Sequence, residues 1–150
     1  MAADGDARGA DPHRLARFVQ AQDGVFAQAL AELRAGRKAG HWMWFVFPQV
    51  AGLGSSATSR HYAVAGLDEA RAYLAHPVLG PRLREATDAV LATSASSAEA
   101  LLGGIDALKL RSSMTLFLRA DPGDDRWQRV LDRFSGGAPD PATDRLLGTR

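Results

Sequence analysis

The chain has 150 residues, of which 46% are hydrophobic and 23% charged, and its formal net charge is +1. This length suits one folded domain, and these proportions exclude an intrinsically disordered or fibrous chain. Because the sequence has no cysteine and no apolar run near the ~20 residues of a membrane helix, we expect a soluble, cytoplasmic protein without disulfides, thiolate metal sites or membrane contact.

The first helix is predicted to follow a polar tail. Residues 1–11 are rich in Ala, Gly and Asp and are expected to be disordered, so the folded domain is predicted over 12–148. Asp11 followed by Pro12 is a typical helix start, because a side-chain oxygen can cap the free amides and Pro suits the first turn. A second helix follows and ends near Gly36.

The segment 42–50 is dense in aromatic residues and valine, which gives it strand character, and Pro48 interrupts it. It leads into Gly52–Ala57, which matches the dinucleotide-binding pattern G-x-G-x-x-A. A Rossmann unit needs further parallel strands, however, and Val, Ile and Thr together number only 15 of the 150 residues. We therefore predict no nucleotide-binding βαβ unit and interpret 42–47 as a short buried helix.

Helical periodicity recurs along the remaining chain. Apolar residues repeat every three to four positions over 67–74, 79–90, 110–118 and 127–134. His76-Pro77 separates the first two of these segments, and Gly136-Gly137 ends the last. The sequence thus predicts an all-α fold: a single compact domain of about seven to nine short helices with no significant β-sheet.

Two stretches of the chain lack acidic residues while they carry several cations. One lies between Glu32 and Asp68, and the other lies between Asp106 and Asp121. If the fold brings these stretches together, they form a positively charged pocket. The small net charge gives no general attraction to nucleic acid, so we expect no nucleic-acid partner, and the sequence leaves the oligomeric state open.

The first candidate site lies in 37–49. A cation, an imidazole and an indole recur here at helical spacing, which suits an aromatic ligand that carries phosphate or carboxylate groups. The candidate ligand-binding residues of this segment are Arg37, Lys38, Trp42, Trp44 and Gln49, with His41 beside them. The alternative is structural: the aromatic residues form core, and His41 caps a backbone carbonyl.

A second candidate site is the glycine loop Gly52-Leu53-Gly54-Ser55-Ser56. If Ser55 or Ser56 caps the helix that follows, the free amides of its first turn face the space above the loop and can bind an anion. Ser55 is therefore a candidate ligand-binding residue. The alternative, which we favour, is an ordinary glycine turn with a serine cap.

The third candidate site lies within the helix predicted over 110–118, where hydroxyls and cations occur amid apolar residues. Its candidate ligand-binding residues are Lys109, Arg111, Ser112, Ser113 and Thr115. Arg111 can bind a phosphate or carboxylate through two parallel hydrogen bonds, and Lys109 offers a compact charge. Equally, Arg111 pairs with an internal acid such as Glu32 or Asp106, and the hydroxyls bond back to the preceding turn.

Candidate catalytic groups are few. His41 is the best general acid or base, because an imidazole titrates near about pH 6.5, and Asp106 and Glu32 are the carboxylates nearest in sequence to the basic motifs. The sequence contains no metal-binding motif and no P-loop, so we expect neither a metal nor a cofactor.

Four parts of the sequence carry a family resemblance. They are Ala31–Gln49, Gly52-Leu53-Gly54 with Ser59 and Tyr62, Tyr73–Leu83 and Lys109–Phe117. They resemble the signature of the bacterial domain of unknown function DUF1810, and the resemblance runs from Leu15 to about Leu147. It implies an all-helical single domain, and it implies no established activity.

These patterns lead to two hypotheses. In the first, the protein binds a small anionic molecule, nucleotide-like, ADP-ribose-like or sugar-phosphate-like, in a basic and aromatic pocket, with hydrolase or transferase activity on it as one option. In the second, it is a non-catalytic cytosolic protein–protein interaction module. The sequence favours neither an enzyme nor a pure binding protein. The first hypothesis requires Lys38, His41, Lys109 and Arg111 to line one cavity.

Overall fold

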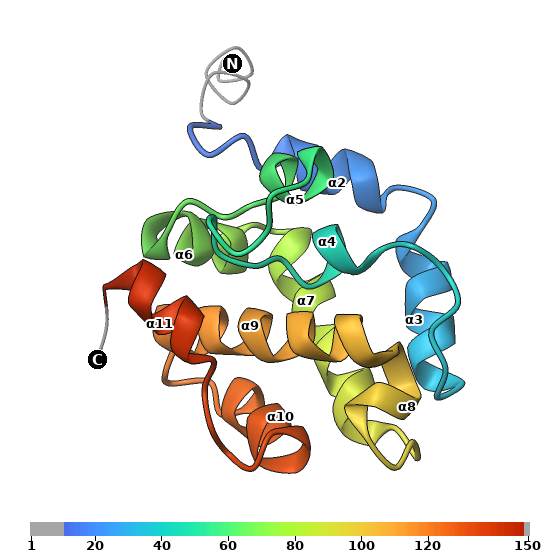
Figure 1. Cartoon of the computed structure of the whole chain (residues 1–150). Coiled ribbons are helices and arrows are strands. Elements are labelled where there is room, and N and C mark those ends of the chain that lie inside the picture. The colour runs from blue at the N-terminus through green and yellow to red at the C-terminus, as the bar shows by residue number, and fades with distance from the viewer. Residues whose placement is uncertain (1–10, 149–150) are drawn as a thin grey trace.

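Ten helices are built from residues 11–148, the part of the chain that the computed structural model describes (Figure 1). They are α2 (Ala16–Gln22), α3 (Phe26–Arg34), α4 (Met43–Val46), α5 (Ala57–His61), α6 (Leu67–Ala75), α7 (Leu79–Ala92), α8 (Ala98–Leu102), α9 (Gly104–Ala120), α10 (Arg126–Phe134) and α11 (Pro141–Leu147). The all-α prediction is confirmed. The helices outnumber the seven to nine predicted, because α5 and α8, with five residues each, are too short to show a periodic pattern.

The predicted disordered tail, residues 1–11, lies outside the described residues except for Asp11. Within residues 11–148, no helix has the length and apolar character needed to cross a membrane.

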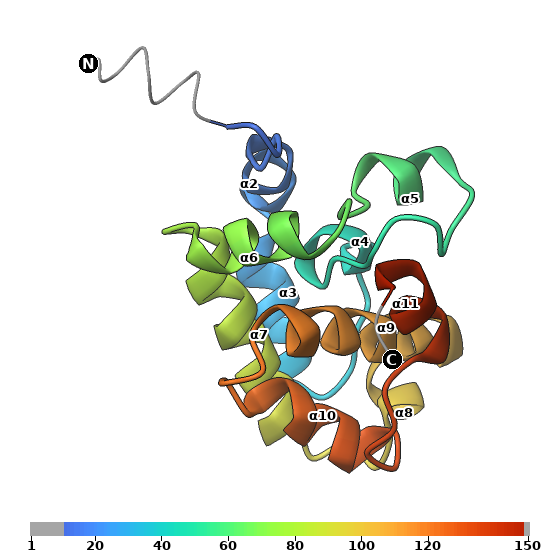
Figure 2. The same cartoon turned by 90° about the vertical axis from the view of Figure 1, so that its left-hand side faces the viewer.

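Helix α9 lies at the centre of the domain (Figures 1 and 2). It has 17 residues and contacts α6, α8, α10 and α11. Its Met114, Leu116 and Phe117 side chains are fully buried. Phe117 packs against Tyr73 of α6 and Trp127 of α10, with ring centres 5.6 and 5.7 Å away. The C-terminal half of α9 is therefore core, and its N-terminal half is the part that reaches the surface.

The aromatic segment 42–50 contains the short helix α4, as predicted, and forms no sheet. The one β feature among residues 11–148 is an isolated parallel bridge between Val50 and Val64. The Val64 amide donates to the Gln49 carbonyl at 2.9 Å, and the Ala51 amide donates to the Val64 carbonyl at 2.8 Å. This bridge fixes the start of the glycine loop beside the segment that follows α5.

Helix α2 begins at Ala16, four residues after the predicted start at Pro12. Arg14 adopts a φ of +51°, in the left-handed region, and this interrupts the helical repeat. Asp11 still acts as a cap, because its carboxylate accepts hydrogen bonds from the amides of Leu15 (2.7 Å) and Ala16 (3.1 Å). The signal for a helix start was therefore correct, and the helix it starts is delayed by one turn.

A buried ion pair joins α2 to α6. The Arg17 guanidinium donates to Glu69 Oε2 at 2.7 Å, and the two side chains are only 7% and 6% exposed. Arg17 also donates to the carbonyls of His61 (2.8 Å), the last residue of α5, and Ala63 (2.9 Å), in the segment that follows α5. The second Glu69 oxygen accepts from the Ala65 amide at 2.9 Å. This Arg17–Glu69 clamp therefore holds that segment between two helices.

Helices α6 and α7 meet at a glycine. Gly80, the second residue of α7, lies against the backbone of Leu74 in α6: a Cβ on Gly80 would overlap the Leu74 carbonyl oxygen and lie 3.0 Å from its carbonyl carbon. His76 caps α7, because its Nδ1 accepts from the amides of Val78 (3.1 Å) and Leu79 (3.2 Å). The corner between the two helices is thus fixed by a close backbone contact and a cap.

Candidate functional site

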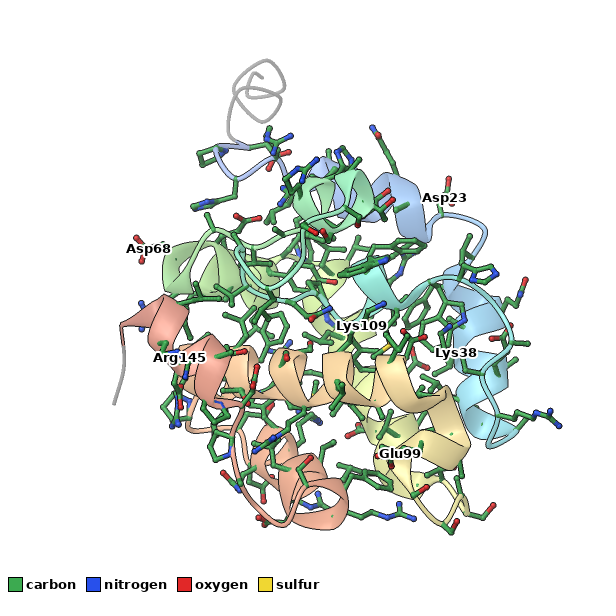
Figure 3. All side chains as sticks on the ribbon, viewed as in Figure 1. Asp23, Lys38, Asp68, Glu99, Lys109 and Arg145 are labelled. Carbon is green, nitrogen blue, oxygen red and sulfur yellow. The ribbon has the colours of Figure 1, made fainter. Side chains whose placement is uncertain are left out.

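Two segments far apart in the sequence meet through one carboxylate. Asp106, in the first turn of α9, binds Lys38 Nζ through Oδ2 at 2.8 Å and Lys109 Nζ through Oδ1 at 3.1 Å. Figure 3 shows the two lysines along the same side of α9, Lys38 toward α3 and Lys109 beneath α4. Burial by itself raises the pKa of Asp106, but the hydrogen bonds and charges of the two lysines outweigh it and hold the pKa below its ordinary value. This lysine–carboxylate trio joins the first and third candidate sites.

Each lysine of the trio lies over an indole. Lys38 Nζ is 5.1 Å from the centre of the Trp42 ring, and Lys109 Nζ is 3.9 Å from the centre of the Trp44 ring. Trp42 is buried in the core, whereas Trp44 is partly exposed. Lys38 and Trp42 therefore form the interior side of the cluster, and Lys109 and Trp44 form its outer side.

Glu32, at the end of α3, holds the segment that carries Lys38. Its Oε1 accepts from the amides of Ala39 and Gly40, both at 2.8 Å, and from Trp42 Nε1 at 2.9 Å, while Oε2 accepts from Gln28 Nε2 at 2.8 Å. Burial alone would raise the pKa of Glu32, but the backbone hydrogen bonds from Gly40 and Ala39, with those from Gln28 and Trp42, lower it to about 2. The predicted catalytic carboxylate is thus a weak base that orders a loop.

We expect this carboxylate to make stability depend on pH. Because the pKa of Glu32 is lower in the folded chain than in the unfolded chain, its stabilisation is complete above about pH 5 and is lost as the pH falls toward 2. Between about pH 6 and pH 3, the wild type should lose about 1–2 kcal/mol more of its free energy of unfolding than Glu32→Gln loses. Urea denaturation at both pH values measures this difference. Glu99→Gln, at an exposed position of α8, is the control and should follow the wild type.

A hollow of about 330 Å³ opens on the outer side of the trio. Five of the predicted ligand-binding residues line it: Trp44, Gln49, Lys109, Arg111 and Ser112. Leu53, Gly54, Ile105, Leu108, Asp140 and Ala142 complete the wall. We call this space the Lys109 hollow. Its size is at the lower end of the range of small-molecule sites, about 300–1,000 Å³.

A second hollow, of about 260 Å³, adjoins the first. The two share Trp44, Gln49, Leu53 and Gly54 as lining residues. The second continues along Val50, Ala51 and Gly52 to Ser59, Arg60, Tyr62 and Ala63. We call it the Tyr62 hollow. The sequence indicated the part of its wall that includes Trp44, Gln49 and the glycine loop, but not the part from α5 and the residues after it, Arg60, Tyr62 and Ala63.

Gln49 is one of the residues that line both hollows, and it has an unpaired donor. The side chain is only 8% exposed, and its Nε2 is buried without a hydrogen-bond partner among residues 11–148. An unpaired buried donor costs about 1–3 kcal/mol, so such a group calls for a partner. Because Gln49 lines both hollows, a molecule in either of them lies beside this side chain.

Arg111 lines the Lys109 hollow while it binds the chain itself. Its Nε donates to the Ala138 carbonyl at 3.0 Å, and its Nη2 donates to the Pro139 carbonyl at 2.9 Å. Ser112 donates to Asp140 Oδ2 at 2.8 Å. Both side chains thus fasten the segment before α11 to α9, which agrees with the structural alternative for this motif.

Asp140 is a lining residue that the sequence did not indicate. Its Oδ2 accepts from the hydroxyls of Ser112 (2.8 Å) and Thr143 (2.6 Å), and its amide donates to Thr115 Oγ1 at 2.8 Å. Burial on its own raises the pKa of Asp140, but hydrogen bonds from Thr143 and Ser112 outweigh it and lower the pKa. Asp140-Pro141 is the helix-start signal used above for the first helix, and it could have identified the cap of α11.

The family is decided by comparison of the whole sequence. The sequence model of a family described as "Protein of unknown function (DUF1810)" matches residues 12–147. The chain belongs to the DUF1810 family. It is similar to a solved structure, "Crystal structure of the conserved hypothetical protein Rv1873 from Mycobacterium tuberculosis", with 49% sequence identity, a TM-score of 0.90 and coverage of 93% of this chain and 100% of that chain. No curated protein matches it. The family resemblance of the sequence motifs is thus confirmed.

The remaining predicted residues of this DUF1810 protein line neither hollow. Of the four residues that the first hypothesis places in one cavity, Lys109 and Arg111 line the Lys109 hollow, whereas Lys38 and His41 do not. Arg37 and His41 are exposed, and the His41 imidazole makes no hydrogen bond to any residue in 11–148. Ser55 is also exposed, and it is Ser56 whose Oγ accepts from the Ser59 amide (3.1 Å) and caps α5. The glycine loop is therefore the turn with a serine cap that we favoured.

Two hydroxyls of α9 point into the DUF1810 fold. Thr115 and Ser113 are fully buried. Thr115 donates to the Arg111 carbonyl at 2.8 Å, the bond to the preceding turn expected in the structural alternative. Ser113 Oγ has no partner among the described residues. Neither side chain is placed to contact a ligand in the two hollows.

The pocket of this DUF1810 protein is less positive than the two acid-free stretches suggest. In the folded chain, acidic residues from outside these stretches lie against them. Glu32 binds the loop before α4, Asp106 lies between the two lysines, and Asp140 binds Ser112. Asp144 pairs with Arg119 at 2.8 and 2.9 Å. Within the trio, two ammonium groups share one carboxylate, so one positive charge is in excess.

Proposed function

We propose that the protein binds a small anionic molecule, of nucleotide or sugar-phosphate kind, in the Lys109 hollow, and that it does so in the cytoplasm. The single observation that supports this proposal is the buried, unpaired Nε2 of Gln49 in the same hollow as the ammonium group of Lys109. An amide donor without a partner and a cation with a charge in excess both gain from the oxygen atoms of one anion.

The electrostatics of the hollow suit a monoanion or dianion of small size. Lys109 shares Asp106 with Lys38, so the three groups together carry one positive charge. Arg111 adds a second positive charge at the wall, and Asp140 removes one. The net attraction is therefore modest, and specificity depends on the direction of the donors rather than on charge alone.

Binding is better supported than catalysis. Of the three candidate catalytic residues, Glu32 and Asp106 are engaged with neighbouring donors, and His41 is exposed away from both hollows. General acid–base catalysis needs a group within hydrogen-bond reach of the reacting atoms. Hydrolase or transferase activity on the bound molecule thus stays a prediction without a placed acid or base.

We expect Lys109→Gln and Gln49→Leu each to weaken the binding of adenosine 5′-monophosphate by about tenfold or more, since a hydrogen bond that involves a charged group contributes about 1.5–3 kcal/mol. Isothermal titration calorimetry measures the affinity. Gln49→Leu should leave the melting temperature unchanged or raise it, because it removes an unpaired buried donor.

Arg145→Gln is the matched control for charge, because Arg145 is exposed on α11 and lies outside both hollows. It should bind the nucleotide as the wild type does. If the wild type releases or absorbs no heat with adenosine 5′-monophosphate, ribose 5-phosphate and inorganic phosphate at millimolar concentration, and none of them raises its melting temperature, the proposal is wrong.

The second candidate function is a non-catalytic protein–protein interaction module. One observation favours it: Ile105 and Leu108, neighbours on one face of α9 at the rim of the Lys109 hollow, are 73% and 65% exposed. In this case a specific partner protein co-purifies with the wild type and with Lys109→Gln. It is lost from the double variant Ile105→Ser with Leu108→Ser. The opposite pattern supports ligand binding.

A further inference from the structure

We infer that the ligand has two parts, a planar aromatic ring in the Tyr62 hollow and an anionic group in the Lys109 hollow, so that it belongs to the nucleotide-like class and not to the sugar phosphates, which have no aromatic ring. This inference rests on the proposed function and narrows it. It is carried by Gln49, which lines two adjoining hollows of different chemistry.

The two hollows are neighbours and each is small. Four residues line both of them, so one molecule can extend from the first into the second past the Gln49 side chain. Small-molecule sites usually measure about 300–1,000 Å³, and the hollows measure about 330 and 260 Å³. The first therefore lies at the lower end of this range and the second just below it, whereas one ligand that occupies both fills a site of ordinary size.

The lining residues of the two hollows differ in chemistry, so each hollow suits a different part of the ligand. In the Lys109 hollow the charged residues are Lys109, Arg111 and Asp140. The Tyr62 hollow has Arg60 as its one charged lining residue, and its other walls are mainly apolar or aromatic: Trp44, Val50, Ala51, Leu53, Tyr62 and Ala63. A phosphate gains hydrogen bonds in the first space, whereas a flat ring loses little by leaving water in the second.

The aromatic walls are rigidly placed. The Tyr62 ring packs against Phe45 and His61, with ring centres 5.3 and 4.6 Å away. The adjoining Ala63 is held by its carbonyl, which accepts from Arg17 of the Arg17–Glu69 clamp at 2.9 Å. Trp44 lines the same hollow, and Lys109 Nζ lies 3.9 Å from the centre of its ring. Two aromatic side chains in one lining favour a planar group over a flexible chain.

The Gln49 carboxamide can form hydrogen bonds with the ring as well as with the anion. A carboxamide presents a donor and an acceptor side by side, the pattern with which Gln and Asn recognise the edge of a nucleobase. Its Nε2 has no partner in the part of the chain that the structure describes, so a ring nitrogen, a ring carbonyl or a phosphate oxygen would satisfy this donor. Its place at the junction of the two hollows suits a molecule in which ring and anion are linked.

The test compares phosphates with and without an aromatic base. Isothermal titration calorimetry is run with adenosine 5′-monophosphate, uridine 5′-monophosphate, ribose 5-phosphate and inorganic phosphate. The tighter of the two nucleotides should bind at least about tenfold more tightly than ribose 5-phosphate, the effect of one stacked base. Ala63→Leu, which fills the Tyr62 hollow, should abolish this difference and leave the affinity for ribose 5-phosphate as it is.

Ala57→Leu, the same substitution on the exposed side of α5, is the matched control and should bind as the wild type does. If ribose 5-phosphate binds as tightly as both nucleotides, or if Ala63→Leu, folded by circular dichroism, keeps the preference for the nucleotide, the inference is wrong while the proposed function stands. If none of the four compounds binds, both are wrong. Loss of ribose 5-phosphate binding in Lys109→Gln, but not in Ala63→Leu, supports both.

Discussion

Replacement of Arg17 by methionine is expected to lower the free energy of unfolding by about 3–5 kcal/mol, as is typical when one partner of a buried ion pair is removed. The substitution leaves the Glu69 carboxylate with a buried charge and only the Ala65 amide as partner. It also frees the carbonyls of His61 and Ala63, which no longer have a donor. The penalty therefore combines an unpaired charge with unsatisfied backbone groups.

Urea denaturation followed by circular dichroism measures this loss, and thermal denaturation should show a melting temperature lower by roughly 10 °C, at about 2–4 °C per kcal/mol for a chain of this size. Arg34→Met is the control. Arg34 pairs with Glu85 at 3.3 Å, but it is 62% exposed, so its loss should cost less than about 1 kcal/mol. Equal effects of the two substitutions would contradict the structural role given to the Arg17–Glu69 clamp.

Gly80→Ala is expected to destabilise the protein by about 2–3 kcal/mol or more, although alanine is normally favoured over glycine in a helix by roughly 0.5–1 kcal/mol. At this position the substitution is expected to destabilise rather than stabilise, because of the packing around Gly80. The added Cβ would overlap the carbonyl oxygen of Leu74, which belongs to the backbone and has no rotamer with which to move away. Helices α6 and α7 must separate to accept it.

Gly104→Ala provides the matched comparison. Gly104 is the first residue of α9, and a Cβ there would have no atom within 4 Å, so this substitution should be neutral or slightly stabilising. Chemical denaturation of both variants measures their free energies of unfolding. The difference between them separates the effect of packing at Gly80 from the effect of helix propensity. A Gly80→Ala variant as stable as Gly104→Ala would show that the α6–α7 contact is softer than described.

The fold was largely predictable because most of its helices are long enough to reveal a period. The segments 110–118 and 127–134 carry apolar residues at three- and four-residue spacing, and both lie within observed helices, α9 and α10. The predicted start of α2 was one turn too early, because no sequence pattern indicated the left-handed conformation of Arg14. The Arg17–Glu69 clamp was missed because 52 residues separate its partners, so no local pattern connects them.

The candidate site was predictable in its location and less so in its chemistry. Residues Trp44 and Lys109 were chosen for the kind of group they carry, and the fold places them in contact. The partners of Arg111 are backbone carbonyls, which every residue has, so no sequence pattern distinguishes them from a bound anion. The unpaired amide of Gln49 is a property of its surroundings, and only coordinates reveal it.

The contact between Lys109 and the Trp44 indole makes the intrinsic fluorescence of Trp44 sensitive to the Lys109 hollow. Trp42 and Trp127 are shielded from solvent, and Trp44 is the partly exposed tryptophan, with an ammonium group 3.9 Å from its ring. The emission of an indole depends on nearby charge and on water. A molecule that enters beside Lys109 therefore alters the fluorescence of one identifiable residue, and occupancy can be followed in solution without a label.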